Sequence, residues 1–265
     1  MIFIEKKGRF GNFLFQYFLG KIIQKKYNQK IVIFSKNENK YDFNSKKNID
    51  KLITNGIFLP KISKILDILK SFCITINDGN YKNFIRESKN HKKNFFISGF
   101  FQDIDLLNQN IEILDDLINY GNLLPNEEFN NFDLTIHLRH LYQDANIDNH
   151  ELYKNQPDIF FYKEIIDKEN PKNIKIVCSN KNNKILLNLK TLYGDKILFS
   201  EKDDITDFTT LLHSKKIILS LSTFSLWAGI LSKAKKVFVP NSGILKKILK
   251  NKILDVNSKF FYIDY

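Results

Sequence analysis

Short apolar runs alternate with segments of helical periodicity along most of this 265-residue chain. The alternation is clearest in the second half, where apolar runs at 132–136, 174–177, 216–219 and 236–239 are separated by helix-forming segments. Such a series is typical of strand–helix–strand units with parallel sheets. The sequence therefore predicts an α/β fold that binds its ligands at the carboxyl ends of its strands.

The remaining elements follow from the same patterns. The expected strands are 2–4, 31–34, 95–98, 132–136, 174–177, 196–199, 216–219 and 236–239. The expected helices are 13–27, 104–119, 159–168, 182–192, 204–213, 225–232 and an amphipathic one near 246–252. The span 37–94 is less regular, and the pattern stops at 121–131, a segment with Gly, Pro and several Asn that is typical of a linker. We expect two domains, 1–125 and 131–265.

Composition excludes several classes of protein. Hydrophobic residues make up 43% of the chain, enough for a sizeable core, and no apolar run approaches the roughly 18 residues of a membrane span. The N-terminus reads neither as a signal peptide nor as an anchor, so we expect a cytoplasmic protein. The two cysteines, Cys73 and Cys178, lie far apart without nearby histidine clusters. They favour neither a disulfide framework nor a structural zinc site.

The formal net charge of +12 is compatible with nucleic acid, an anionic membrane or a phosphorylated small molecule. The lysines are scattered, and a chain rich in Lys, Asn, Ile and Phe is typical of AT-rich coding, so part of the charge carries no function. No nucleic-acid-binding module is recognisable, and we expect no nucleic-acid partner. In the cluster at 246–252, lysines alternate with apolar residues, as on a helix with a solvated basic face.

The first chemically informative segment is Gly8-Arg9-Phe10-Gly11-Asn12, directly after the first expected strand. Its glycines permit positive φ and close backbone approach. Arg9 and Asn12 place a cation and an amide in a loop at the carboxyl end of a strand, where α/β proteins bind ligands. The alternative is an ordinary glycine-containing turn, because a short Gly-rich loop is a weak signal.

The second segment is His137-Leu138-Arg139-His140, at the end of the strand expected at 132–136. If the strand continues, His137 and Arg139 point to the same side. The planar fork of Arg139 can then hold phosphate oxygens with two hydrogen bonds. The alternative is a surface arginine in an ion pair beside a packed histidine.

The third segment is Ser220-Leu221-Ser222-Thr223-Phe224-Ser225, between an expected strand and an expected helix. It places four hydroxyls in six residues, whereas capping a helix needs one. The hydroxyls and the N–H groups of the helix N-terminus together favour an anion site. In the following helix we expect Trp227 in the core, and Ala228 and Gly229 to allow close approach to the sheet.

Together these segments resemble the bacterial α1,2-fucosyltransferase family, one of the GDP-fucose-dependent enzymes with the α1,6- and protein O-fucosyltransferases. The first family motif is matched by Gly8, Gly11, Asn12, Phe15, Gln16 and Tyr17, and the second by His137 and Arg139. The third is matched by Ser222, Thr223, Phe224, Ser225 and Trp227, with Asp207 at the distance of the family's preceding acidic residue. Gly99-Phe100-Phe101-Gln102 is similar to a further Gly-Tyr-Phe-Gln segment, and Phe161-Tyr162 to a paired-tyrosine helix start. The order and spacing agree over nearly the whole chain.

Two departures bear on donor identity and acceptor specificity. His140-Leu141-Tyr142 stands where the family has Arg-Gly-Asp, and Leu221 and Leu226 replace an Asn and a Trp of the third motif.

The resemblance implies a GT-B fold, with two Rossmann-like domains that face each other across a cleft on which the three segments converge. It implies GDP-fucose as donor substrate, inversion at the anomeric carbon, and no metal or other cofactor. Arg139 would bind the donor phosphates, and Asn12 would lie near the sugar and the glycosidic oxygen. The other residues expected at the donor are Gly11, His137, Asp204, Asp207, Ser220, Ser222, Thr223, Phe224 and Ser225, with Asp207 before Asp204 at the guanine and ribose.

The sequence indicates the base for the acceptor hydroxyl less clearly than it indicates the donor site. Asp144, Asp148 and His150 follow Arg139 closely and are the candidates. The alternative is that they are plain loop residues, because a loose, oxocarbenium-like transition state needs little assistance from a base.

The resulting expectation is a metal-independent transferase that moves L-fucose to a glycan hydroxyl, with an α1,2 linkage in a bacterial surface polysaccharide. A basic chain without an anchor would work at the inner face of the cytoplasmic membrane, in peripheral contact with anionic lipid. The alternatives are a GT-B transferase with another nucleotide sugar, a non-catalytic nucleotide-sugar or glycan-binding protein, and a basic membrane-surface or nucleic-acid binder.

Overall fold

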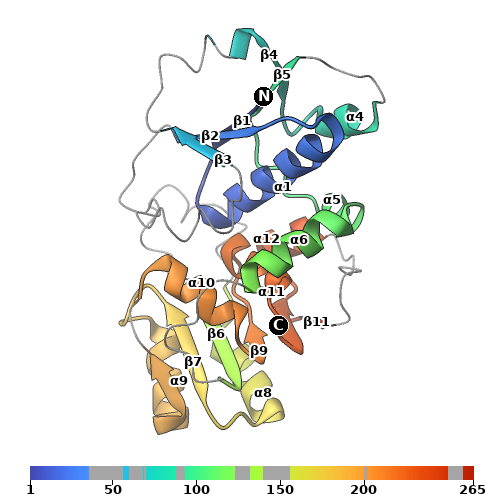
Figure 1. Cartoon of the computed structure of the whole chain (residues 1–265). Coiled ribbons are helices and arrows are strands. Elements are labelled where there is room, and N and C mark those ends of the chain that lie inside the picture. The colour runs from blue at the N-terminus through green and yellow to red at the C-terminus, as the bar shows by residue number, and fades with distance from the viewer. Residues whose placement is uncertain are drawn as a thin grey trace. The chain divides into compact units, whose positions relative to one another are not determined.

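The computed structural model describes residues 1–35, 56–59, 68, 70–87, 93–122, 132–139, 156–199, 202–249 and 259–265. The chain forms two compact units, Met1–Leu117 (unit 1) and Ile118–Tyr265 (unit 2), each built around a sheet (Figure 1).

Unit 1 has a five-stranded sheet of order β3-β2-β1-β5-β4, in which every pair of neighbours is parallel. Its strands are β1 (Ile2–Lys6), β2 (Ile31–Ser35), β3 (Gly56–Leu59), β4 (Cys73–Ile76) and β5 (Asn94–Ile97). Its helices are α1 (Phe10–Tyr27), α4 (Tyr81–Arg86), α5 (Ile104–Asn108) and α6 (Ile111–Asn122), the last of which crosses into unit 2. Strands β3 and β4 and helix α4 were not expected from the sequence, and they lie in the less regular span 37–94.

Helix α1 packs tightly against the central strand β1 (Figure 1). A Cβ atom at Gly20 would lie 2.7 Å from Ile4 Cδ1, so glycine allows this close approach. The helix begins at Phe10 and not at the expected residue 13, because the carbonyl of Arg9 already accepts the first helical hydrogen bond from Phe13, 3.0 Å away. Gly11 and Asn12 therefore lie in the first helical turn and not in a loop.

The single helix expected at 104–119 is two helices, α5 and α6. They are separated at Asn110, whose side chain donates to the carbonyl of Leu106 over 2.8 Å. The carbonyl of Asn110 accepts from the amides of Ile113 and Leu114 and so starts the second helix. Since α6 extends to Asn122, the expected linker is helical at its first two residues, and 123–131 lie outside the described residues.

Unit 2 has a six-stranded, wholly parallel sheet of order β11-β10-β9-β6-β7-β8. Its strands are β6 (Leu134–Leu138), β7 (Ile174–Cys178), β8 (Ile197–Phe199), β9 (Lys216–Ile218), β10 (Lys236–Pro240) and β11 (Phe260–Ile263). Its helices are α8 (Ile159–Glu169), α9 (Lys184–Tyr193), α10 (Asp204–Leu212), α11 (Thr223–Leu231) and α12 (Gly243–Leu249), with a 3₁₀ turn η1 (Gly194–Lys196). Among the described strands of this unit, β11 alone was not expected from the sequence; the 3₁₀ turn η1 was not expected either.

Helices cover both faces of the unit 2 sheet. On one face, α8 and α9 bury Phe161, Ile165 and Leu186 in a cluster with Ile218 and Phe238 of the sheet. On the other face, a Cβ atom at Gly229 of α11 would lie 3.0 Å from Val237 and 3.4 Å from Leu219. Successive strand residues point to opposite faces, so these contacts place α11 on the side away from α8 and α9.

The sequence predictions for the core of unit 2 are confirmed. Trp227 is fully buried, and Gly229 lets α11 approach the sheet closely. The amphipathic helix is α12, which buries Ile244, Leu245, Ile248 and Leu249 and exposes Lys246 and Lys247. The predicted α/β class with parallel sheets is likewise confirmed in both units. Among the residues described here, no helix is long and apolar enough to cross a bilayer.

Replacement of Asp158, the N-cap of α8, should destabilise unit 2. Its carboxylate accepts hydrogen bonds from the amides of Phe160 and Phe161 at 3.0 and 3.1 Å. We expect Asp158→Ala to lower the free energy of unfolding by about 1 kcal/mol, and Asp158→Asn to lower it much less, because asparagine also caps helices. The fluorescence of Trp227, the only tryptophan, reports unit 2 in a urea titration. Equal midpoints for the two variants would contradict this role.

Candidate active site

The carboxyl ends of β6 and β9 bring the second and third motifs together in unit 2. The two strands are parallel neighbours, with Ile136 opposite Ile218. Continuation of this register places Arg139 beside the Ser220–Ser222 segment, at the same edge of the sheet. Arg139 is half-buried and directly follows the last residue of β6. The sequence-based placement of these two motifs at one sheet edge is consistent with this geometry.

His137 connects the second motif to the third. Its Nδ1 shares a hydrogen bond of 2.6 Å with the hydroxyl of Ser220, which is fully buried. Its ring lies 5.4 Å from that of Phe224, and Phe224 packs edge-on against Phe208 of α10 at 5.3 Å. Strand β6, the segment after β9 and helices α10 and α11 thus share one packed cluster beside Arg139.

The hydroxyls of the third motif are held mainly by the backbone. Helix α11 begins at Thr223 and not at the expected Ser225, and Ser222 is its N-cap, accepting from the amide of Phe224 at 3.2 Å. Ser225 donates to the carbonyls of Ser220 and Ser222, both 3.2 Å away. Thr223 is buried in the first turn. These bonds fix the helix N-terminus, where the amide dipoles favour an anion.

Asp207 is a buried carboxyl one turn into α10. Burial raises the pKa of this group to about 8, the nearby Asp204 and Asp203 add to the rise, and Lys175 opposes it. The side chain is therefore mostly protonated at neutral pH and can both donate and accept hydrogen bonds. Asp204 is exposed, and Asp203 caps the helix by accepting from the amides of Ile205 and Thr206.

Gln156 contacts the site and was not identified from the sequence. Its Oε1 accepts a hydrogen bond from the amide of Leu221, 3.3 Å away. This bond links the segment before α11 to a part of the chain 65 residues earlier. A glutamine far from the motif in sequence carries no local pattern that points to this contact.

In unit 1, the first motif forms a rigid turn after β1. Gly8 adopts φ 69, in the left-handed region that favours glycine. The buried side chain of Gln16 closes the turn, because its Nε2 donates to the carbonyl of Lys7 at 2.7 Å and its Oε1 accepts from the same residue's amide at 3.1 Å. Asn12 accepts a hydrogen bond from Gln102 at 2.8 Å. Neither the partner of Asn12 nor the role of Gln16 was predicted from the sequence.

The remaining candidates cannot be placed. Two sets of residues lie outside the described part of the chain. They are the candidate bases Asp144, Asp148 and His150, and the segment His140-Leu141-Tyr142, which differs from the family motif. Within the described ranges, no group of three or more His, Cys, Asp or Glu residues could hold a metal ion. The convergence of Asn12 with Arg139 in one cleft stays a prediction, as do the roles of all these residues.

The buried carboxyl of Asp207 should make stability depend on pH. From about pH 4 to about pH 8 the folded protein keeps a proton that the unfolded chain releases, so this group's contribution is present at low pH and is lost as the pH rises to its folded pKa of about 8. Asp207→Asn cannot ionise. The free energy of unfolding of Asp207→Asn, relative to wild type, should therefore increase steadily with pH over this range.

Urea titrations at several pH values, followed by Trp227 fluorescence, measure this difference. Asp195→Asn, at an exposed position of the same unit, is the control. A difference between Asp207→Asn and wild type that stays constant with pH would show that the carboxyl is ionised in the folded protein.

Comparison with solved structures supports the fold. FUT1 from Arabidopsis thaliana, a mutant in complex with GDP, matches with a TM-score of 0.53 and 11% identity over 90% of this chain and 70% of that one. The fucosyltransferase NodZ from Bradyrhizobium matches with a TM-score of 0.52 and 12% identity over 89% and 94%. NodZ α-1,6-fucosyltransferase soaked with GDP-fucose gives 0.51 and 12% over 89% and 93%. At 11–12% sequence identity, the similarity to these structures shows a shared fold and no more.

Sequence comparison supplies the family. No curated protein matches the chain. The sequence model of glycosyl transferase family 11, however, matches residues 82–255. This range includes the second and third motifs and Gln102, the hydrogen-bond partner of Asn12. This match extends over well more than half of the chain, and it confirms the family relation expected from the motifs. The chain belongs to glycosyl transferase family 11.

Proposed function

We propose that this glycosyltransferase moves L-fucose from GDP-fucose to a glycan hydroxyl, with inversion and without a metal ion. The observation that carries the proposal is the position of Arg139 beside the N-terminus of α11, at one edge of a parallel sheet. A guanidinium at a strand end and a helix N-terminus are suited to a diphosphate. The solved NodZ and FUT1 structures of similar fold, soaked with GDP-fucose or complexed with GDP, agree with such a donor.

In this reaction the bond between the anomeric carbon and the β-phosphate oxygen breaks, and the acceptor oxygen bonds to the opposite face of the sugar. The electron pair leaves with GDP, and its negative charge is stabilised by Arg139 and the amides at the start of α11. The acceptor proton passes to a base, for which Asp144, Asp148 and His150 are the candidates. Gly11 contributes its amide in the first turn of α1, and Asn12 lies near the sugar.

The guanosine part of the donor would bind at α10. A protonated Asp207 can donate one hydrogen bond and accept another, as a ribose hydroxyl or a guanine edge requires. Asp204, which lies near enough to Asp207 to raise its pKa, would be the second carboxyl at this ligand. His137, Ser220, Phe224 and Ser225 would support the donor site through the contacts they make with one another.

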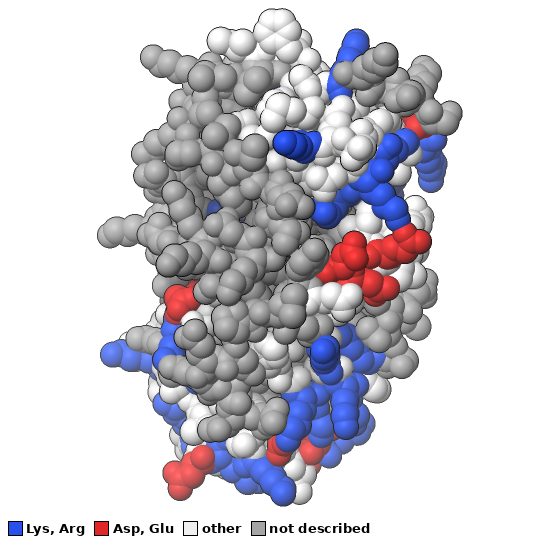
Figure 2. All heavy atoms as spheres, viewed as in Figure 1, with Lys and Arg blue, Asp and Glu red and all other residues white. Residues whose placement is uncertain are grey.

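The acceptor and the place of the reaction form a separate part of the proposal. We infer an α1,2 linkage in a bacterial surface polysaccharide from the motifs alone, with the enzyme in peripheral contact with anionic lipid. Figure 2 shows several groups of Lys and Arg side chains on one face of the molecule, with Asp and Glu among them. Such a surface is attracted to anionic lipid at low ionic strength.

Arg139→Ala should reduce transfer from GDP-fucose about 10²–10³-fold, the usual loss for one preorganised donor to developing charge. Arg139→Lys should recover only part of it, because lysine lacks the planar fork. Arg86→Ala, at an exposed position of α4, is the control with the same change of residue type. Release of GDP with acceptor or water is the measurement, and wild-type turnover by Arg139→Ala would contradict the assignment.

A panel of GDP-fucose, GDP-mannose and UDP-sugars separates the alternatives. We expect GDP-fucose to raise the thermal unfolding temperature most, since at equal concentration the ligand with the lowest Kd stabilises the folded state most. A larger shift with another sugar nucleotide would indicate a different donor, consistent with the replaced segment at 140–142. A shift with GDP-fucose but no turnover would indicate a binding protein.

A further inference from the structure

Gln102 and Asn12 meet although 90 residues separate them in sequence. Gln102 follows β5 and Asn12 follows β1, and these strands are parallel neighbours, so their following segments meet at one edge of the unit 1 sheet. Gln102 Nε2 donates to Asn12 Oδ1 over 2.8 Å, and both side chains are half-buried.

This hydrogen bond sets the direction of the Asn12 amide. A carboxamide has an acceptor end and a donor end, so a donor bound to Oδ1 fixes where Nδ2 points. Nδ2 faces the turn at Gly8, where an added Cβ atom would lie 2.5 Å from it. The glycine at position 8 therefore leaves room for the donor end of Asn12 in this orientation.

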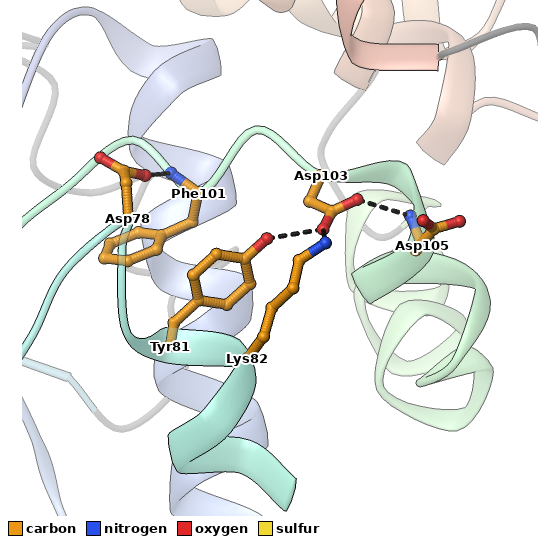
Figure 3. A network of polar contacts seen from close by, with 6 residues as sticks. All are labelled: Asp78, Tyr81, Lys82, Phe101, Asp103 and Asp105. Atoms are coloured by element: carbon orange, nitrogen blue, oxygen red, sulfur yellow. Dashed lines mark hydrogen bonds and ion pairs between the residues drawn. The ribbon is translucent and has the colours of Figure 1, made fainter.

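The backbone on the N-terminal side of Gln102 is fixed by Asp78 (Figure 3). The carboxylate of Asp78 accepts from the amide of Phe101 at 2.6 Å, as Figure 3 shows. It also accepts from the amide of Phe100 at 3.0 Å. Phe101 adopts φ 52, which is uncommon for a bulky residue, and its side chain is buried. Such a strained residue persists only where its surroundings hold it in place.

The backbone on the C-terminal side is fixed by Asp103. Its carboxylate accepts from the hydroxyl of Tyr81 at 2.5 Å, from Lys82 at 2.7 Å and from the amide of Asp105 at 3.1 Å (Figure 3). Burial alone would raise the pKa of Asp103, but the hydrogen bonds from Lys82 and Tyr81 outweigh it and the pKa lies below its ordinary value. Burial and the bond to Asp103 raise the pKa of Tyr81, which therefore keeps its proton. Gln102 thus lies between two anchored neighbours.

We propose that Gln102 is a positioning residue that holds Oδ1 of Asn12 so that Nδ2 donates to the transferred sugar or its glycosidic oxygen. This role rests on the proposed function, in which Asn12 lies near the sugar. Gln102 itself acts through Asn12 and not on the substrate. The anchors at Asp78 and Asp103 keep its amide in register with Asn12, as a preorganised site requires.

Two substitutions of Gln102 distinguish positioning from packing. Gln102→Glu keeps the size but offers only acceptors, so it binds Nδ2 of Asn12 and turns the amide round. Gln102→Ala removes the bond without reversing the amide. We expect kcat to fall about 10²-fold in Gln102→Glu, near the lower end of the loss for one oriented donor, and less in Gln102→Ala, with KM for GDP-fucose unchanged in both. A packing role predicts the opposite order, because alanine removes more contacts.

A double-mutant cycle with Asn12→Ala completes the test. If Gln102 acts through Asn12, then Asn12→Ala/Gln102→Glu loses no more activity than Asn12→Ala alone. Gln109→Glu, the same change at the exposed C-cap of α5, is the control and should have the kcat of wild type. Wild-type kcat in Gln102→Glu, a larger loss in Gln102→Ala, or losses that multiply in the double variant would each overturn the role of Gln102 alone. A wild-type enzyme inactive with every donor of the panel would overturn the proposed function, and this role with it.

Discussion

Parallel pairing of the central strands is the constraint on which the positions of the candidate residues depend. In unit 1, β1 lies beside β5, and the segments that follow them join Asn12 to Gln102 across 90 residues. In unit 2, β6 lies beside β9, and a hydrogen bond joins His137 to Ser220 across 83 residues. Both contacts follow from one rule, since neighbouring parallel strands end at the same edge of a sheet. The rule applies separately within each unit.

Each edge is then made rigid by polar side chains that bind the backbone. Gln16 closes the turn after β1, Asp78 holds the segment after β5, and Ser222 and Ser225 hold the start of α11. Leaving a buried polar group without a partner costs about 1–3 kcal/mol, more than the roughly 1 kcal/mol that one hydrogen bond contributes. These segments consequently have few alternative conformations, which is the condition for placing an amide or a guanidinium within a fraction of an ångström.

Local sequence patterns predicted the elements that depend on local periodicity. The five strands that were expected in unit 2 are found within two residues of their expected positions, because continuous apolar runs bounded by polar residues mark buried parallel strands. The predicted first residue was wrong for α1 and α11, which begin at Phe10 and Thr223. In these helices the capping interactions, and not the apolar period, determine where the helix begins. The short strands β3 and β4 are held by pairing with β2 and β5, which no window of sequence contains. The split at Asn110 and the start of α4 depend on local hydrogen bonds of asparagines, which an apolar period does not reveal.

The same distinction applies to the site. Residue type and position at a strand end were enough to select His137, Arg139 and the hydroxyls before α11. The partners Gln102, Asp103 and Gln156 were not predicted, because each is defined by a contact with a distant segment. The Gly99–Gln102 segment was noticed as a family motif, but the motif alone does not indicate which side chain Gln102 contacts.

The two edges differ in chemistry in the way that the proposed reaction requires. The edge of unit 1 presents the amides of Asn12 and Gln102, which can bond to sugar oxygens, with the exposed Arg9 in the same segment as Asn12. The edge of unit 2 presents Arg139 and a helix N-terminus, which favour the diphosphate. Asp207 would oppose that attraction if it were ionised. Burial raises its pKa to about 8, so the carboxyl is largely neutral at pH 7 and adds little repulsion to the phosphates. In the proposed reaction, a neutral carboxyl at this position would serve as a hydrogen-bonding group for the nucleoside of the donor.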